Sequence, residues 1–251
     1  MQIELLRHDG RDWSRPFPAL DSDRTLLLVF GASSFLDNAE PINELVAAFP
    51  SSHIVGCSSS GEIFEDTISD GSLAVAVAQF GATDVRVAVT PIRSESSVAA
   101  GVELARQLAE PDLSAVLVLS EGLDVNGSDL VEGLNEHLPG VTITGGLAGD
   151  GDRFEQTWTL VDGKPAAGFA TAVGLYGDRV QVGHGSQGGW DRFGPERIVT
   201  RSRDNVLYEL DGEAALELYK TYLGELADGL PATGLLFPLA LRAKEGDSKQ
   251  L

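Results

Sequence analysis

Apolar residues follow two kinds of pattern along the chain, short continuous runs and longer runs with a spacing of three or four. The continuous runs LLLVF (26–30) and AVLVL (115–119) predict strands that are buried on both faces. A helical pattern follows each run. The apolar positions of these two helices are Ile42, Leu45, Val46 and Phe49, and Leu130, Val131, Leu134 and Leu138. The chain therefore starts two strand–helix units with the same order.

The two units match residue by residue at one constant spacing. The matched pairs are Val29 and Val118, Ile42 and Val131, Leu45 and Leu134, Pro50 and Pro139, Ile54 and Ile143, and Gly56 and Gly145. One residue of slippage later, FEDT (64–67) matches FEQT (154–157). We therefore predict an internal repeat over residues 26–90 and 115–184.

The remaining patterns extend both units. Strands are predicted over 72–80, 84–92, 169–176 and 178–185, and a helix over 96–110 links the copies. A further helix is predicted over 211–224 and a strand over 233–242. The fold class that follows is α/β, with duplicated strand-helix-strand-strand-strand units that form mixed β-sheets flanked by helices. We expect the two copies to be related by a pseudo-two-fold axis.

Charge and composition narrow the range of partners. The 251 residues carry a formal net charge of −20, so we expect neither nucleic acid nor an anionic membrane as a partner. No run of 18 apolar residues occurs, and MQIELLRHDGRDW lacks the apolar core of a signal peptide, so we expect a cytoplasmic protein. Cys57 is the single cysteine, which excludes metal motifs built on cysteine pairs. We expect no metal and no cofactor.

The stretch GCSSSGEIF (56–64) has the appearance of a reactive loop. A phosphate loop requires a lysine where this chain has Glu62, whose charge would repel phosphate. A nucleophile elbow requires Gly-x-Ser-x-Gly before a helix, whereas Ser58 precedes two more serines and no helical pattern. A serine-loop hydrolase acting through Ser58 stays open as an alternative, but we expect that the protein is not an enzyme.

Glycine-rich loops occupy equivalent places in the two copies, and both directly follow a core strand. Small residues and polar groups at two such loops suit a cleft that binds a small polar molecule. The alternative is that both loops are simply tight strand ends. The candidate ligand-binding residues are Cys57, Ser58, Ser60, Gly61 and Glu62 in the first loop, and Gly146, Leu147, Gly149 and Asp150 in the second.

His184 and Trp190 are further candidates for ligand contact. His184 lies where a predicted strand breaks into glycines, and Trp190 follows closely. A histidine beside an aromatic residue in a glycine-opened backbone also suits a haem ligand. A surface histidine on a loop is the alternative interpretation.

Several ordered motifs together resemble the FIST family, named for F-box and intracellular signal transduction proteins. They are VGCSSSGEI, VNGSDLVEGL, TGGLAGDG, FGPERIVTRS and YELDGEAALELYKTYLG. The resemblance implies a FIST N-like ligand-binding domain over residues 1–205 and the start of a FIST C-like domain, shortened, over 206–251. By position it adds Gly56 and Gly145 to the two loops, and it also covers Trp190, Gly194, Thr200, Asp211, Gly212 and Tyr219, to which no role is assigned.

The resemblance further implies a function in signal transduction. It predicts a sensory domain that binds a small ligand, such as an amino acid or a similar metabolite, in a cleft between the repeated halves. A separate output protein, such as a histidine kinase or a cyclic-dinucleotide enzyme, would read the ligand state. A branch of the family resembles haem-binding nitric-oxide sensors, so a haem sensor is the alternative.

Overall fold

The predicted α/β fold class is confirmed by a computed structural model that describes residues 1–183, 185, 191, 194–242 and 249–250. The chain divides into two units, Met1–Gly183 and His184–Leu251. The predicted boundary after residue 205 stays a prediction.

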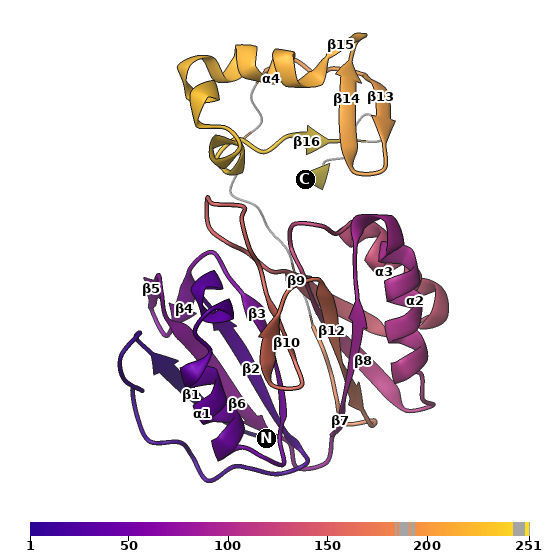
Figure 1. Ribbon diagram of the computed structural model, residues 1–251. Helices are drawn as coiled ribbons and strands as arrows, with labels where there is room; N and C mark the ends of the chain where they lie inside the picture. The colour runs from indigo at the N-terminus through magenta and orange to yellow at the C-terminus, as the bar shows by residue number, and fades with distance from the viewer. Residues whose placement is uncertain (184, 186–190, 192–193, 243–248, 251) are drawn as a thin grey trace. The chain divides into compact units, whose positions relative to one another are not determined.

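The first unit contains two mixed sheets (Figure 1). The first sheet has the strand order β1 (Gln2–His8), β6 (Leu73–Gln79), β2 (Thr25–Gly31), β3 (His53–Ser58), β10 (Thr159–Val161) and β11 (Lys164–Ala166). The second sheet has the order β7 (Asp84–Pro91), β12 (Phe169–Tyr176), β8 (Leu113–Ser120) and β9 (Thr142–Leu147). A small hairpin of β4 (Glu62–Phe64) and β5 (Thr67–Ser69) projects from the first half.

The same local unit occurs in both sheets. β2 pairs in parallel with β3 and antiparallel with β6, and β8 pairs in parallel with β9 and antiparallel with β12. The register is also shared, because Val29 lies opposite Gly56 in one sheet and Val118 opposite Gly145 in the other. The repeated strand–helix–strand units are therefore built alike, while an overall two-fold relation stays a prediction.

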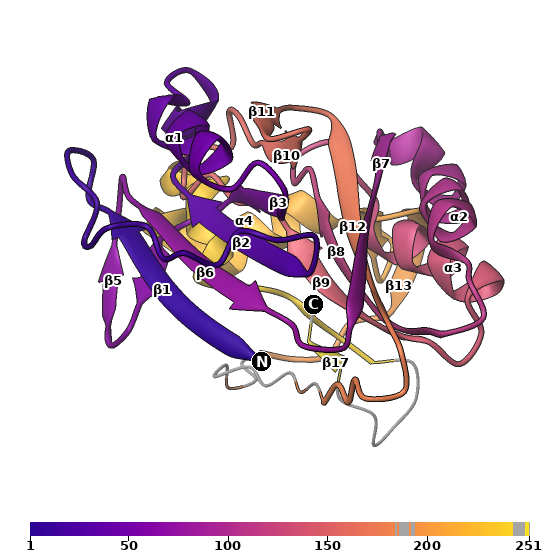
Figure 2. The same cartoon turned by 90° about the horizontal axis from the view of Figure 1, so that it is seen from below.

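Helices cover the outer faces of the two sheets (Figure 2). α1 (Glu40–Ala48) packs on the first sheet, and α2 (Ser97–Leu108) and α3 (Gly127–His137) lie side by side on the second. The inner faces of the sheets contact one another through a cluster that includes Leu26, Val55, Val85 and Val173. Strands that are buried on both faces explain the continuous apolar runs in the sequence.

The second unit is small and is described by itself. Its antiparallel sheet contains β13 (Val199–Arg203), β14 (Val206–Leu210) and β15 (Glu213–Ala214), followed by α4 (Ala215–Leu223). Asp211 accepts a hydrogen bond from the Ile198 N–H at 2.9 Å and pairs with Arg197 at 3.1 Å. Asp211 therefore fixes the turn of the sheet, and α4 begins four residues later.

Two predicted strands are wrong. Residues 178–183 form a turn and an irregular segment, because β7 and β8 already occupy both sides of β12 and a following strand cannot form a hairpin with it. Over 233–242 the chain forms a 3-10 turn (Ala232–Leu235) and then the short strand β16 (Ala240–Leu241), which pairs with β17 (Lys249–Gln250). Pro238 within this run lacks the N–H that a continuous strand needs.

Candidate functional site

The carboxyl ends of β3 and β9 each contain a glycine that allows close packing against the neighbouring strand. A Cβ atom at Gly56 would lie 2.0 Å from the carbonyl oxygen of Val29, and one at Gly145 would lie 1.8 Å from that of Val118. No larger residue fits at either position without moving the backbone. The glycines thus set the course of the chain into the two predicted loops.

The two predicted loops meet in direct contact. The Gly149 N–H donates to the carbonyl of Ser58 at 2.9 Å, and the Gly151 N–H donates to Ser60 Oγ at 3.0 Å. A Cβ atom at Gly149 would lie 2.4 Å from Ser60 Oγ. The sequence suggested a cleft lined by both loops, and at this contact the loops instead pack tightly against one another.

Glu62 is buried and is bound by its own half of the molecule. Its Oε2 accepts hydrogen bonds from the Ser72 N–H at 3.1 Å and from Ser72 Oγ at 3.0 Å. Its Oε1 accepts from Ser59 Oγ at 3.0 Å. In this arrangement the carboxylate fixes the loop after β3 to the segment that precedes β6.

Asp150 is the equivalent acid of the second loop and is bound just as completely. Its Oδ1 pairs with Arg153 at 2.7 Å, and its Oδ2 accepts from the N–H groups of Glu155 and Gln156 at 2.9 and 3.0 Å. Burial by itself raises the pKa of Asp150, but hydrogen bonds from Ser33, from these two N–H groups and from Arg153 outweigh burial and hold the pKa well below its usual range. Asp150 therefore stays ionised near neutral pH and shapes the second loop.

Glu121 is a third buried acid at the junction, and the sequence reasoning missed it. Its Oε2 accepts from Thr157 Oγ1 at 2.8 Å, and its Oε1 accepts from the N–H groups of Leu123 and Asp124. Glu121 directly follows β8. The two predicted loops were chosen because they are glycine-rich and follow a core strand. A search for any polar residue directly after a core strand would also have found Glu121.

Cys57 and Ser58 are both buried at the end of β3. Cys57 packs with Leu119 and Ala148, and burial raises the pKa of its thiol to about 12. Ser58 Oγ accepts a hydrogen bond from the Trp158 N–H at 3.2 Å and is screened from solvent. The thiol is therefore protonated at neutral pH and the hydroxyl has a structural partner.

Gly61 has a φ of 136°, which favours glycine at the turn before Glu62.

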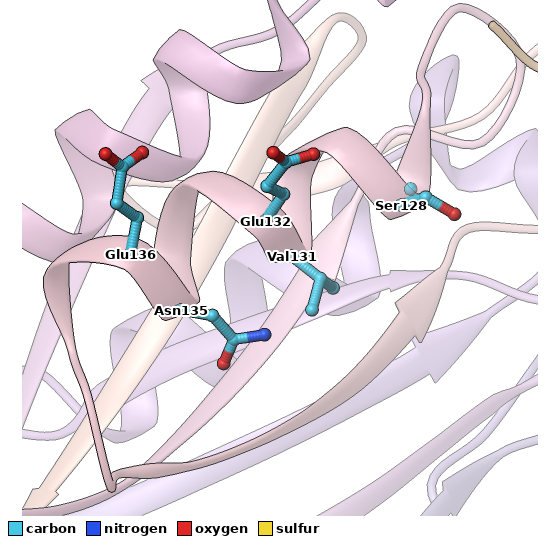
Figure 3. A pocket seen from close by; sticks show the side chains of 6 residues that line it. Ser128, Val131, Glu132, Asn135 and Glu136 are labelled. Atoms are coloured by element: carbon cyan, nitrogen blue, oxygen red, sulfur yellow. The ribbon is translucent and has the colours of Figure 1, made fainter.

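An open space lies beside the second loop, between α3 and β9. It is a cavity of about 340 Å³ lined by Val118, Gly127, Leu130, Val131 and residues 143–147, and it includes the predicted site residues Gly146 and Leu147. A wider hollow of about 790 Å³ follows the outer side of α3, and in Figure 3 Glu132 and Glu136 project to one side of that helix while Val131 and Asn135 project to the other. Residues 57–62 line neither space.

Three further findings complete the description of the site. His184 and Trp190 lie outside the described residues. Within the described part of the chain, no group of three or more His, Cys, Asp or Glu side chains is arranged to hold a metal ion. None of the helices in the described ranges has the length and apolar character needed to cross a membrane.

A family model described as the FIST N domain matches residues 25–213, which covers all of the first repeat, the second repeat and the sheet of the second unit up to Glu213. No curated protein matches the chain.

Proposed function

The chain belongs to the FIST N domain family of signal-transduction sensory domains, and on this basis we propose that it senses a small ligand bound beside the junction of its two halves. The ligand is a small molecule such as an amino acid or a similar metabolite. The proposed site is the cavity between α3 and β9, at the carboxyl end of a parallel strand pair, where open α/β sheets commonly bind ligands.

One observation carries this proposal. The strand that walls the cavity leads directly into the loop that contacts the other half, because Leu147 lines the cavity and Gly149 donates to the carbonyl of Ser58. A ligand that contacts Gly146 and Leu147 therefore lies two or three residues from the contact between the halves. The ligand shifts the packing of the halves if it binds one relative arrangement of them more tightly than the other.

We propose that the output lies in a separate protein. A histidine kinase or a cyclic-dinucleotide enzyme that prefers one arrangement of the halves would read the ligand state. In this proposal the chain itself binds rather than catalyses and needs no cofactor. The loops Ser58–Glu62 and Gly146–Asp150 then act as the joint between the halves, with Glu62 and Asp150 fixing the shape of each loop.

Native mass spectrometry of the freshly purified chain, followed by thermal-shift measurements with a panel of metabolites, tests the proposal. We expect a released small mass or a ligand-dependent rise in Tm, and the effect should disappear in Val131→Trp, which fills the cavity. Val98→Trp is the matched control, because Val98 and Val131 are both helical valines that are 39% exposed and Val98 does not line the cavity. A ligand that binds both variants equally would place the site elsewhere, and a chain that binds nothing would contradict the sensory role.

A further inference from the structure

Trp158 completes the first half of the molecule. It is fully buried in the cluster that contains Val29 of β2 and Ile42 of α1. Its backbone pairs with the edge of β3 that faces away from β2. The Ser58 N–H donates to the Trp158 carbonyl at 2.9 Å, and the Trp158 N–H donates to Ser58 Oγ at 3.2 Å. Its indole N–H donates to the carbonyl of Ala32 at 3.0 Å. One aromatic residue on an extended backbone thus closes the space beside α1 and β3.

The cavity of the second half is lined by counterparts of residues that belong to the core cluster of Trp158 or pack against it. Val118, Val131 and Ile143 line it, and they match Val29, Ile42 and Ile54, which belong to the Trp158 cluster or pack against it. Leu147 occupies the place of Ser58, because Ser120 pairs with Leu147 in the register in which Gly31 pairs with Ser58. The cavity therefore lies in the part of the second half that corresponds to the Trp158 cluster of the first half.

Within the first unit, Met1–Gly183, no strand fills this second space, because β10 pairs with the first sheet although it belongs to the second repeat. Thr159 of β10 lies opposite Cys57, and the second sheet ends at β9. In both sheets the residue after the parallel strand bonds inward, since the Ser59 N–H donates to Gly31 at 2.9 Å and the Ala148 N–H to Ser120 at 2.7 Å. Backbone groups alternate between the two sides of a strand, so the Leu147 N–H points to the free edge, as the Ser58 N–H does.

We propose that this cavity binds the large planar side chain of an aromatic amino acid, with the attached carbonyl group accepting a hydrogen bond from the Leu147 N–H. The amino acid is either free or part of an extended peptide, since both present the same side chain and carbonyl. This inference rests on the proposed sensory function and names its ligand class. It follows from the filled site in the first half, which shows what this arrangement of strand, helix and edge accommodates.

Two features of the site indicate the charge of the ligand and the hydrogen bonds available to it. Glu132 and Glu136 line the adjoining hollow and the chain has a net charge of −20, so a neutral or cationic ligand is favoured over an anionic one. Leu147 lacks the hydroxyl with which Ser58 accepts the Trp158 N–H. Leu147→Ser therefore supplies the second hydrogen bond of the first half.

Isothermal titration of the full chain with three probes tests the inference. The probes are L-tryptophan, N-acetyl-L-tryptophanamide and a blocked Thr-Trp-Thr peptide, the sequence of residues 157–159. We expect saturable binding that Val131→Trp weakens by about tenfold or more and that Val98→Trp leaves unchanged. Leu147→Ser should tighten binding of the two blocked probes by about three- to tenfold through the added hydrogen bond.

The probes also separate the two sources of the ligand. Binding of the free amino acid alone assigns the site to a metabolite, and binding of the blocked probes alone assigns it to a protein strand. No binding of any aromatic probe overturns the inference. If a metabolite without an aromatic ring then binds in a way that Val131→Trp blocks, the sensory proposal stands while the aromatic assignment falls; if nothing binds, both fall.

Discussion

The two halves of the first unit begin from the same strand–helix–strand unit and end in different states. In the first half, Trp158 and β10 cover the edge of β3 and fill the space beside α1. In the second half, the edge of β9 ends the sheet, and a cavity of about 340 Å³ remains beside α3. The comparison teaches that a duplicated unit can have one copy closed by a strand of the other and the second copy left open at the same edge.

The helical layers differ as well. α1 packs on the first sheet, whereas two helices, α2 and α3, pack closely together on the second, where a Cβ atom at Gly101 would lie 2.2 Å from the carbonyl of Leu130. This contact holds α3, which lines the cavity, against α2. In the second half, α3 is therefore fixed in place by a second helix.

The largest expected effect is at the filled site. Trp158→Ala should lower the free energy of unfolding by about 3–5 kcal/mol, because it removes a fully buried indole and the hydrogen bond from that indole to the Ala32 carbonyl. Urea denaturation measures this loss. Trp13→Ala is the control, since Trp13 is only partly buried at the margin of the same cluster and should cost less. A loss below about 1 kcal/mol for Trp158→Ala would contradict its role as the residue that completes the first half.

Asp150→Asn should lower stability by about 1.5–3 kcal/mol at pH 7, because the ionised carboxylate accepts charge-assisted hydrogen bonds. The folded-state pKa of Asp150 is lowered, so its contribution is present above the ordinary pKa of about 4 and is lost as the pH falls below it. Urea unfolding of both proteins from pH 7 to pH 2 should show the difference shrinking toward acid. A difference that stays constant would mean that the charge of Asp150 does not matter.

Gly101→Ala should cost about 1–3 kcal/mol, because the added methyl group collides with the backbone of α3 at the helix crossing. Gly81→Ala is the matched control, since a Cβ atom there has no neighbour within 4 Å. Thermal unfolding of both variants gives the comparison. Equal Tm values would show that the two helices move apart easily and that the wall of the cavity is soft.

The smallest expected effect is on the reactivity of the Cys57 thiol, which is buried at the contact between the halves. Cys57 should fail to react with a thiol reagent in the native chain at pH 8, because burial raises its pKa to about 12. One thiol per chain should react in urea, as Cys57 is the single cysteine. Rapid labelling of the native chain would show that the contact among Cys57, Leu119 and Ala148 opens readily.

Much of this comparison could be predicted from the sequence. The paired apolar residues, such as Val29 with Val118, predicted the repeated unit, and both loops lie directly after core strands, as the sequence indicated. Both predictions depend on local patterns, which the strand and helix periods carry.

The filled and open states could not be predicted, because they depend on which sheet β10 joins. Thr159 pairs with Cys57 across about a hundred residues of chain, and no local pattern specifies that choice. The roles of Glu62 and Asp150 also depend on loop conformation, since the partners of each acid include backbone N–H groups that the loop brings into place. The sequence shows two acids in matched places but not that both are already bound.

The most direct measurement of the central claim is a titration of the ¹⁵N-labelled chain with N-acetyl-L-tryptophanamide, followed by the amide resonances in ¹H–¹⁵N spectra. The open second half predicts that the largest saturable shifts occur at Leu147, Gly146 and Val131, which line the cavity. Unchanged resonances at Leu147 and Gly146 under saturating probe would contradict the claim that the second half is the unfilled counterpart of the first.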